Sequence, residues 1–212
     1  MALTGLPKFQ NFWPTANNSI THSNPLFDEK VSCPNLEKLD ISGLKSISAL
    51  WSHQLPNDYF TKLQTLRVSC CGKLKNLMSP SMARGLLNLK NLDIRHYKSM
   101  EEVITKGEGI MTLFPRLETL YLGELPKLGH FFLTEHALEF PFLRKVTICN
   151  CPEMKTFVQQ GISVSTPSLT EVYIDYKEVK VDDLNKWIQQ RFNNKEQEAS
   201  DHAEAEPSHA RR

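Results

Sequence analysis

A short apolar pattern recurs six times along the chain and constrains its fold more than any other feature. Each copy fits L-x-x-[L/V]-x-[I/V/L], and the copies begin at Leu36, Leu63, Leu89, Leu117, Leu143 and Leu169. Successive copies therefore lie 27, 26, 28, 26 and 26 residues apart. Self-similarity at a period of about 20 to 50 residues indicates a stacked array in which each unit is one small supersecondary element.

The pattern and its period are those of a leucine-rich repeat. The last two apolar residues of each copy alternate with polar ones, so they share one face of a short strand. One unit cannot bury that face alone, and neighbouring units must stack to form a continuous core. We therefore expect an α/β solenoid, namely a leucine-rich-repeat horseshoe with a concave parallel β-sheet and an irregular convex side, closed by a C-terminal helix. One short helical turn is expected on the convex side, over residues 82–87.

The repeats divide the chain into a solenoid of about six units at residues 31–180 and a partial N-terminal repeat at residues 1–30. The segment that starts at Leu3 matches the one that starts at Leu122, so most of the strand before Leu3 is expected to be missing. A solenoid end without a capping unit exposes apolar core. We therefore expect the chain to be the C-terminal part of a longer protein or a truncated product, with marginal stability and an exposed apolar N-terminal edge.

The C-terminal segment has the features of a closing element. Residues 181–192 place apolar side chains at intervals of three and four, as on one stripe of a helix, and Asp182 or Asp183 can cap its first turn. This predicts a capping helix over 181–192. Residues 193–212 contain no apolar side chain larger than Ala, and we expect them to form a disordered tail.

Charge and composition exclude several classes of protein. Lys and Arg number 25 against 24 Asp and Glu, which gives a formal net charge of +1 and argues against binding to nucleic acid. No apolar stretch is long enough for a membrane span, and the N-terminus lacks the features of a secretory signal. We therefore expect a cytoplasmic protein whose 5 cysteines are reduced.

The repeat units resemble those of a known family. The unit F-P-x-L-x-x-L-x-L-x-x-L-P-K-L, its variants V-S-C-C-G-K-L and I-C-N-C-P-E-M, and the closing D-L-N-K-W-I-Q-Q-R-F are similar to the C-terminal repeats of plant nucleotide-binding leucine-rich-repeat disease resistance proteins. The similarity is closest to the branch with an N-terminal coiled coil. It implies an intracellular immune receptor, in which the repeats restrain a nucleotide-binding switch and help to sense pathogen effectors.

The chain lacks the family's phosphate-binding loop, G-x-x-x-x-G-K-[S/T], so only recognition and regulation carry over. We accordingly expect a non-enzymatic module without cofactors. The resemblance implies as partners the nucleotide-binding domain of the parent receptor, a guarded host protein or a pathogen effector.

The outward side chains of the concave sheet are the default binding surface of such an array. Four cations and four anions are mixed there, which suits a protein partner better than a phosphate backbone. Arg and Tyr dominate interface hot spots, so Arg67, Arg95, Tyr121 and Tyr173 are the candidate anchors. The candidate protein-binding residues are Lys38, Asp40, Arg67, Asp93, Arg95, Tyr121, Lys145, Tyr173 and Asp175.

Three alternatives stay open from the sequence. The repeats could be the substrate-recognition part of a ubiquitin-ligase adaptor, or the chain could be a truncated product without a role of its own. A remote alternative is a thiol hydrolase or metal site, because Cys70, His96 and Glu124 occupy one column in three consecutive repeats. Cys71 and Cys151 lie in equivalent columns three repeats apart, too far for a disulfide, and are expected to be small buried groups.

Overall fold

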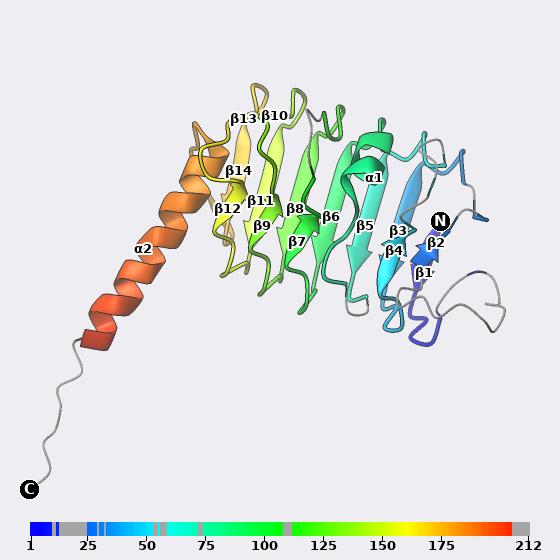
Figure 1. Cartoon of the computed structure of the whole chain (residues 1–212), viewed down its shortest axis with the longest axis horizontal. Helices are drawn as coiled ribbons and strands as arrows, with labels where there is room; N and C mark the ends of the chain where they lie inside the picture. The colour runs from blue at the N-terminus through cyan, green and yellow to red at the C-terminus, as the bar shows by residue number, and fades with distance from the viewer. Residues whose placement is uncertain are drawn as a thin grey trace, which may run out of the picture.

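The structure is a computed structural model of the whole chain, and it describes residues 1–9, 12, 25–28, 30–31, 33–52, 55, 59–71, 74–107 and 112–204. Of residues 196 and 198–204 only the backbone is described. The described strands are stacked side by side in chain order, and one long helix stands at the C-terminal end (Figure 1). The expected leucine-rich-repeat solenoid is thereby confirmed.

One eight-stranded sheet, here called the main sheet, carries all six copies of the repeat pattern. Its seven leading strands run parallel, and the last strand pairs antiparallel to its neighbour. In sheet order the strands are β1 (Ala2–Thr4), β3 (Lys38–Ser42), β5 (Thr65–Ser69), β6 (Asn91–Arg95), β8 (Thr119–Gly123), β11 (Lys145–Cys149), β14 (Glu171–Ile174) and β15 (Lys177–Glu178).

The repeat leucines lie where the periodicity predicts. In β6, for example, Leu92 and Ile94 are buried, while Asn91, Asp93 and Arg95 face outward and are only partly buried. Neighbouring strands pair in register, so each repeat position forms a straight row across the sheet. The buried rows make one continuous apolar core that runs along the array.

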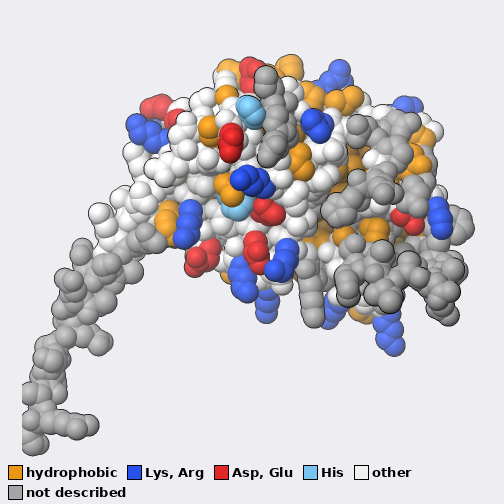
Figure 2. Space-filling model, in the orientation of Figure 1, with side chains coloured by type: hydrophobic (Ala, Val, Ile, Leu, Met, Phe, Trp, Pro, Cys, Tyr) orange, Lys and Arg blue, Asp and Glu red, His pale blue; other side chains and the backbone are white. Residues whose placement is uncertain are grey.

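The opposite side of the solenoid consists of short extended pieces, as predicted. Three small sheets run along it, with the pairs β2 (Pro25–Phe27) and β4 (Ala49–Trp51), β10 (Leu138–Glu139) and β13 (Val164–Ser165), and the triplet β7 (Glu102–Ile104), β9 (His130–Phe132) and β12 (Thr156–Val158). The predicted helical turn is present as α1 (Pro80–Gly85), which starts two residues before the expected range. Lys, Arg, Asp and Glu side chains are interspersed over the face in view in Figure 2.

His130 lies on β9, in the segment that connects two copies of the repeat pattern. Its Nε2 atom is 3.2 Å from the Glu102 carboxylate of β7, the neighbouring strand. The apolar residues Phe131 and Phe132 that follow it are fully buried, so this segment must pair with its neighbours and cannot be a free loop.

A turn of fixed geometry ends most main-sheet strands. The residue directly after the strand has a positive φ at Gly43 (74°), Cys70 (51°), His96 (58°), Glu124 (56°) and Asn150 (52°). Four of these residues donate their backbone N–H to the next strand, as His96 does to Gly123 O at 3.0 Å. The left-handed conformation therefore turns the chain away from the sheet while one more rung of the hydrogen-bond ladder is kept.

The helix α2 (Leu184–Glu204) closes the C-terminal end of the core. Asp183 caps its first turn by accepting a hydrogen bond from the Lys186 N–H at 2.9 Å, as predicted for this Asp pair. Leu184 and Ile188 are buried against the last repeat. The helix thus covers apolar surface that would otherwise face solvent.

A buried amide joins α2 to the outermost strand of the triplet. Asn185 Oδ1 accepts hydrogen bonds from the backbone N–H groups of Phe157 (2.9 Å) and Val158 (3.0 Å) and from the Thr156 hydroxyl (2.8 Å). Asn185 Nδ2 donates to Ile162 O at 3.3 Å. This one side chain therefore replaces the next strand at the edge of β12, where unpaired backbone groups would be costly.

The prediction of a disordered tail from residue 193 was wrong for residues 193–204, because α2 continues to Glu204. The absence of large apolar side chains shows that this segment has no core to pack against, but it does not prevent helix formation. Once the packed first turns nucleate the helix, each further residue adds one hydrogen bond, and Glu, Gln, Lys and Ala propagate helices well. Residues 205–212 of the predicted tail lie outside the described residues.

Candidate protein-binding surface

The candidate surface is the outward face of the main sheet, here called the main-sheet face. Eight of the nine predicted residues lie on it: Lys38, Asp40, Arg67, Asp93, Arg95, Tyr121, Lys145 and Tyr173. They come from six strands, which bring residues as far apart in the chain as Lys38 and Tyr173 into one surface. None of the eight is fully buried.

The ninth predicted residue, Asp175, is committed to α2 and not to the main-sheet face. It follows β14 with a φ of 45°, accepts a hydrogen bond from the Asn150 N–H at 2.9 Å and forms an ion pair with Arg191 of the helix. Burial acts to raise its pKa, but the Asn150 N–H and the Arg191 guanidinium outweigh burial and lower it. Strand alternation alone does not reveal this role, because the partners come from another repeat and from the closing helix.

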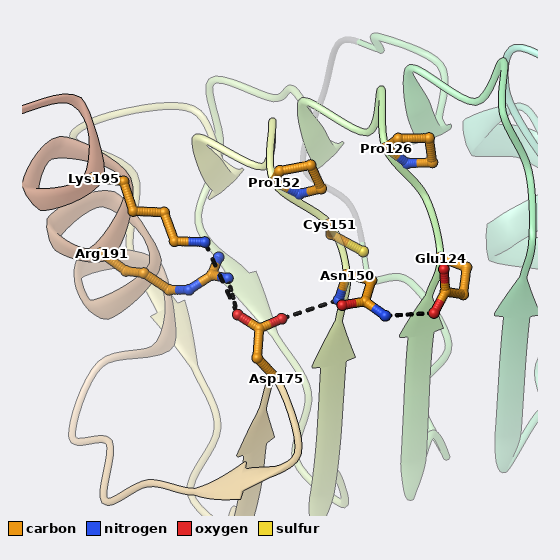
Figure 3. A pocket seen from close by; sticks show the side chains of 8 residues that line it. All are labelled: Glu124, Pro126, Asn150, Cys151, Pro152, Asp175, Arg191 and Lys195. Carbon is orange, nitrogen blue, oxygen red and sulfur yellow. Dashed lines mark hydrogen bonds and ion pairs between the residues drawn. The ribbon is translucent and has the colours of Figure 1, made fainter. Parts of the chain in front are cut away.

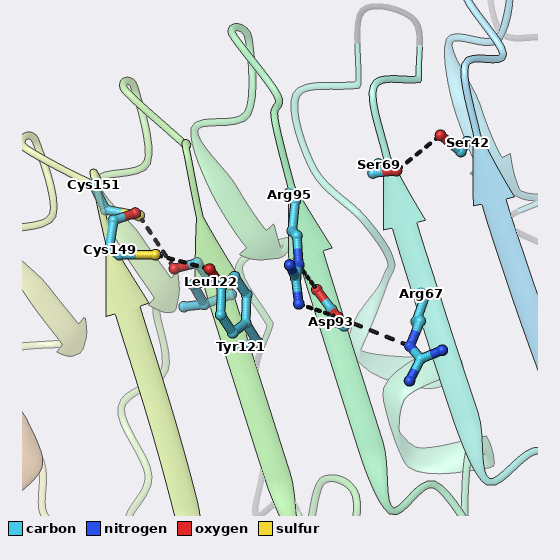
Figure 4. A network of polar contacts seen from close by, with 9 residues as sticks. All are labelled: Ser42, Arg67, Ser69, Asp93, Arg95, Tyr121, Leu122, Cys149 and Cys151. Carbon is cyan, nitrogen blue, oxygen red and sulfur yellow. Dashed lines mark hydrogen bonds and ion pairs between the residues drawn. The ribbon is translucent and has the colours of Figure 1, made fainter. Parts of the chain in front are cut away.

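A layered polar network occupies the centre of the main-sheet face (Figure 4). Arg95 binds Asp93 with two hydrogen bonds, from Nε to Oδ1 at 2.6 Å and from Nη2 to Oδ2 at 2.8 Å. The same guanidinium lies 3.8 Å from the centre of the Tyr121 ring, within the range of a cation–π contact. The hydrogen bonds to Asp93 raise the pKa of Arg95, so this guanidinium is held charged and in one orientation.

The ring of Tyr121 in turn covers a cysteine. Its hydroxyl is 3.0 Å from Cys149 Sγ, and Cys149 is fully buried although its strand position faces outward. The hydrogen bond with Cys149 and partial burial raise the pKa of Tyr121 to about 12. Cys149 thus points outward from the strand, but Tyr121 shields it from solvent.

Gly123 makes this arrangement possible. A Cβ atom at that position would lie 2.6 Å from Cε1 of Tyr121 and 3.2 Å from Cys149 Sγ. The tyrosine ring therefore rests in a notch that only glycine leaves open. Sequence reasoning missed Gly123 as a site residue, although a glycine at an outward strand position, two residues after a tyrosine, signals a close approach.

Substituting alanine for Gly123 tests this notch. We expect the added methyl group to displace the Tyr121 ring and to raise the rate of Cys149 alkylation at least about tenfold, because a buried thiol reacts only through local opening. The measurement is peptide mass spectrometry after timed alkylation, on a Cys70→Ser background because Cys70 is exposed. Gly129→Ala is the matched control, since its Cβ would meet nothing closer than 3.7 Å; equal Cys149 rates in the two variants would contradict the notch.

A second pair of contacts lies toward the C-terminal end of the face. Lys145 Nζ is 2.7 Å from Glu171 Oε2 and 4.6 Å from the centre of the Tyr173 ring. The hydrogen bond to Glu171 raises the pKa of Lys145. The two predicted tyrosine anchors therefore share one construction, a cation on the ring that a carboxylate holds in place. Glu171 is not among the nine predicted residues, although its carboxylate positions the lysine.

The cysteines of the repeat ladder are buried groups, as predicted. Cys71 donates to Ser69 O at 2.9 Å, and Cys151 lies 3.4 Å from Cys149 O. Both are at most 1% exposed, and no described cysteine forms a disulfide. Burial is the main cause that raises the pKa of Cys151, to about 12 from its ordinary value of 9.0.

The raised Cys151 pKa predicts an alkaline loss of stability. The unfolded chain releases this thiol proton near its ordinary pKa and the folded chain only near pH 12, so the stabilisation is complete below about pH 9 and declines toward about pH 12. We expect Cys151→Ala to lose less unfolding free energy than the unmodified chain over that interval. Urea unfolding at several pH values measures this, and parallel declines for both proteins would refute it.

The column of Cys70, His96 and Glu124 occupies the turn position that follows three consecutive main-sheet strands. All three residues have the left-handed turn conformation, and the Glu124 carboxylate accepts a hydrogen bond from the Asn150 amide. Among the residues that the structure describes, no group of three or more His, Cys, Asp or Glu side chains could hold a metal ion. The shared column thus reflects the repeat's turn geometry.

A shallow hollow of about 360 Å³ lies at the same rim, between these turns and α2 (Figure 3). Pro126 and Pro152 form one wall, and Arg191 and Lys195 of α2 form the other. Asp175 lies between the walls and pairs with both cations, at 4.0 Å in the case of Lys195. The hollow is therefore the seam along which the helix docks on the last two repeats.

Comparison with known proteins shows which proteins carry similar repeats. The family described as "Plant disease resistance protein RPS2-like, leucine-rich repeats" matches residues 16–98 and 35–178. The chain is 32% identical over 121 residues to "Probable disease resistance protein At1g61190" and 30% identical over 119 residues to "Disease resistance protein UNI", both of Arabidopsis thaliana.

These two alignments cover 55% and 54% of this chain but only 12% and 13% of the relatives. No solved structure matches the chain. In the part of the chain that the structure describes, no helix is long and apolar enough to cross a membrane. The chain belongs to the RPS2-like leucine-rich-repeat family of plant disease resistance proteins, since that family matches well over half of its length.

Proposed function

We propose that this chain is the recognition and regulatory module of an intracellular plant immune receptor, and that its main-sheet face binds protein. The chain matches the leucine-rich repeats of plant disease resistance proteins, and this match supports a role as a plant defence module. More specifically, we assign the chain to the C-terminal repeats of a nucleotide-binding receptor that has an N-terminal coiled coil. In that setting the module is non-enzymatic, and its partners are the receptor's nucleotide-binding domain, a guarded host protein or a pathogen effector.

The observation that carries the binding role is the preorganised chemistry of the main-sheet face. Arg95 and Tyr121 are held by Asp93, Gly123 and Cys149, and Lys145 and Tyr173 are held by Glu171. Arg and Tyr are the residues that most often dominate protein interfaces, and fixing them in advance reduces the entropy lost on binding. A face that served only as solvated surface has no need of such packing.

The test compares variants of two faces in plant tissue. Tyr121→Ser and Tyr173→Ser remove the two rings from the main-sheet face, and Lys75→Ser removes an exposed cation that pairs with Glu101 away from the main sheet. We expect the two tyrosine variants to lose the proteins that co-purify with the tagged chain and to alter the defence response, while Lys75→Ser retains both. Equal behaviour of all three variants would overturn the assignment of binding to this face.

A further inference from the structure

Arg67 is only weakly neutralised on the main-sheet face. Both Asp93 oxygens accept hydrogen bonds from Arg95, at 2.6 and 2.8 Å. Arg67 Nε lies 3.9 Å from Asp93 Oδ2, which is beyond hydrogen-bond range. Among the described residues this is the only ion pair of Arg67, so its guanidinium donors remain available on the surface.

The exposed fractions of Arg67, Arg95 and Asp93 show which charge a partner meets first. The side chain of Arg67 is 61% exposed and that of Arg95 43%, while that of Asp93 between them is 18% exposed. The carboxylate therefore lies beneath two guanidinium groups on adjacent strands. A hollow of about 300 Å³ adjoins them, lined also by Ser69 and Asp40.

Asp40 limits the direction from which an anion can approach. It lies on β3 and pairs in register with Arg67 on β5, while Arg95 lies on β6 on the other side of Arg67. An incoming carboxylate is repelled by Asp40 on the β3 side, whereas on the β6 side the Asp93 charge is already bound by Arg95 and lies beneath the guanidinium groups. The two arginines together can supply the paired donors that carboxylates bind most strongly.

We infer that the protein partner of the main-sheet face places an acidic side chain, Asp or Glu, between Arg67 and Arg95. This inference rests on the proposed function, because it names the partner chemistry of the same surface. Rim charges of this kind set partner choice and association rate more than total affinity. The contact is therefore a determinant of specificity, with Asp40 acting against anions that approach over β3.

A random-peptide display library, selected on the folded whole chain, tests the inference. We expect the selected peptides to be enriched in Asp and Glu and to bind more weakly as the salt concentration rises. Arg67→Gln keeps a polar side chain with N–H donors and removes the charge, so it should weaken a selected acidic peptide by roughly tenfold. Asp40→Asn should strengthen the same peptide, a gain that general damage to the fold would not produce, and Lys75→Gln is the matched control away from the main sheet.

The outcomes separate the two proposals. Peptides without acidic enrichment that still lose binding in Tyr173→Ser would overturn the acidic contact and leave the binding face in place. Peptides that are insensitive to Arg67→Gln, Asp40→Asn and Tyr173→Ser alike, or a selection that yields no binder, would count against both. Acidic peptides that respond to Arg67→Gln and Asp40→Asn in opposite directions would support both.

Discussion

Replacing Phe131 by alanine is expected to lower the free energy of unfolding by about 3–5 kcal/mol, the range for deleting a fully buried aromatic side chain. Phe131 is 0% exposed and stacks on Phe157, with ring centres 4.6 Å apart and an angle of 3° between the planes. Phe140 meets both rings edge-on, at 6.3 and 6.1 Å. The loss of Phe131 leaves a cavity, because the surrounding strands are hydrogen-bonded in register and cannot collapse into the space.

The same substitution at Phe142 is the control. Phe142 is 53% exposed at the rim where β11 begins, so Phe142→Ala should change stability by no more than about 0.5 kcal/mol. Urea unfolding followed by circular dichroism measures both variants. Similar losses for the two phenylalanines would show that the core between β9 and β12 is not packed as described.

Replacing Asn185 by alanine is expected to cost roughly 3 kcal/mol, although the residue is small and polar. The change leaves the buried N–H groups of Phe157 and Val158 without an acceptor, and each such orphan costs about 1–3 kcal/mol. It also frees the edge of β12, where α2 closes the array. Because repeat arrays unfold through their weakest interface, we expect the helix and the last repeat to open first.

Hydrogen exchange distinguishes local opening of α2 and the last repeat from a uniform loss of stability. In Asn185→Ala the amides of β12 and the first turns of α2 should exchange fastest, while those of β6 and β8 stay protected. Asn194→Ala removes an exposed amide from the same helix and should leave both patterns unchanged. Equal exchange behaviour of the two variants would show that Asn185 is not the closing contact.

The positions of most site residues could be predicted from the sequence, but their contacts could not. Strand alternation and repeat length predict which side chains share one face of the sheet. The structure confirms this for Lys38, Asp40, Arg67, Asp93 and Arg95. The contacts of Tyr121 could not be predicted, because they depend on Gly123 of its own strand and Cys149 of the next repeat meeting at one point. Asp175 was assigned to the face because alternation continues past β14, whereas the helix captures it.

The sequence by itself determined the period, the direction of each strand face, the buried leucines and the family resemblance, because these depend on spacing within one repeat. The tertiary structure decided which polar groups meet between repeats, where the strand edge is sealed and how far α2 extends. Those outcomes depend on side chains from distant segments competing for the same partners. Asp93 is the clearest case: its register places it beside Arg67, yet Arg95 occupies both of its oxygens and leaves Arg67 open to a partner.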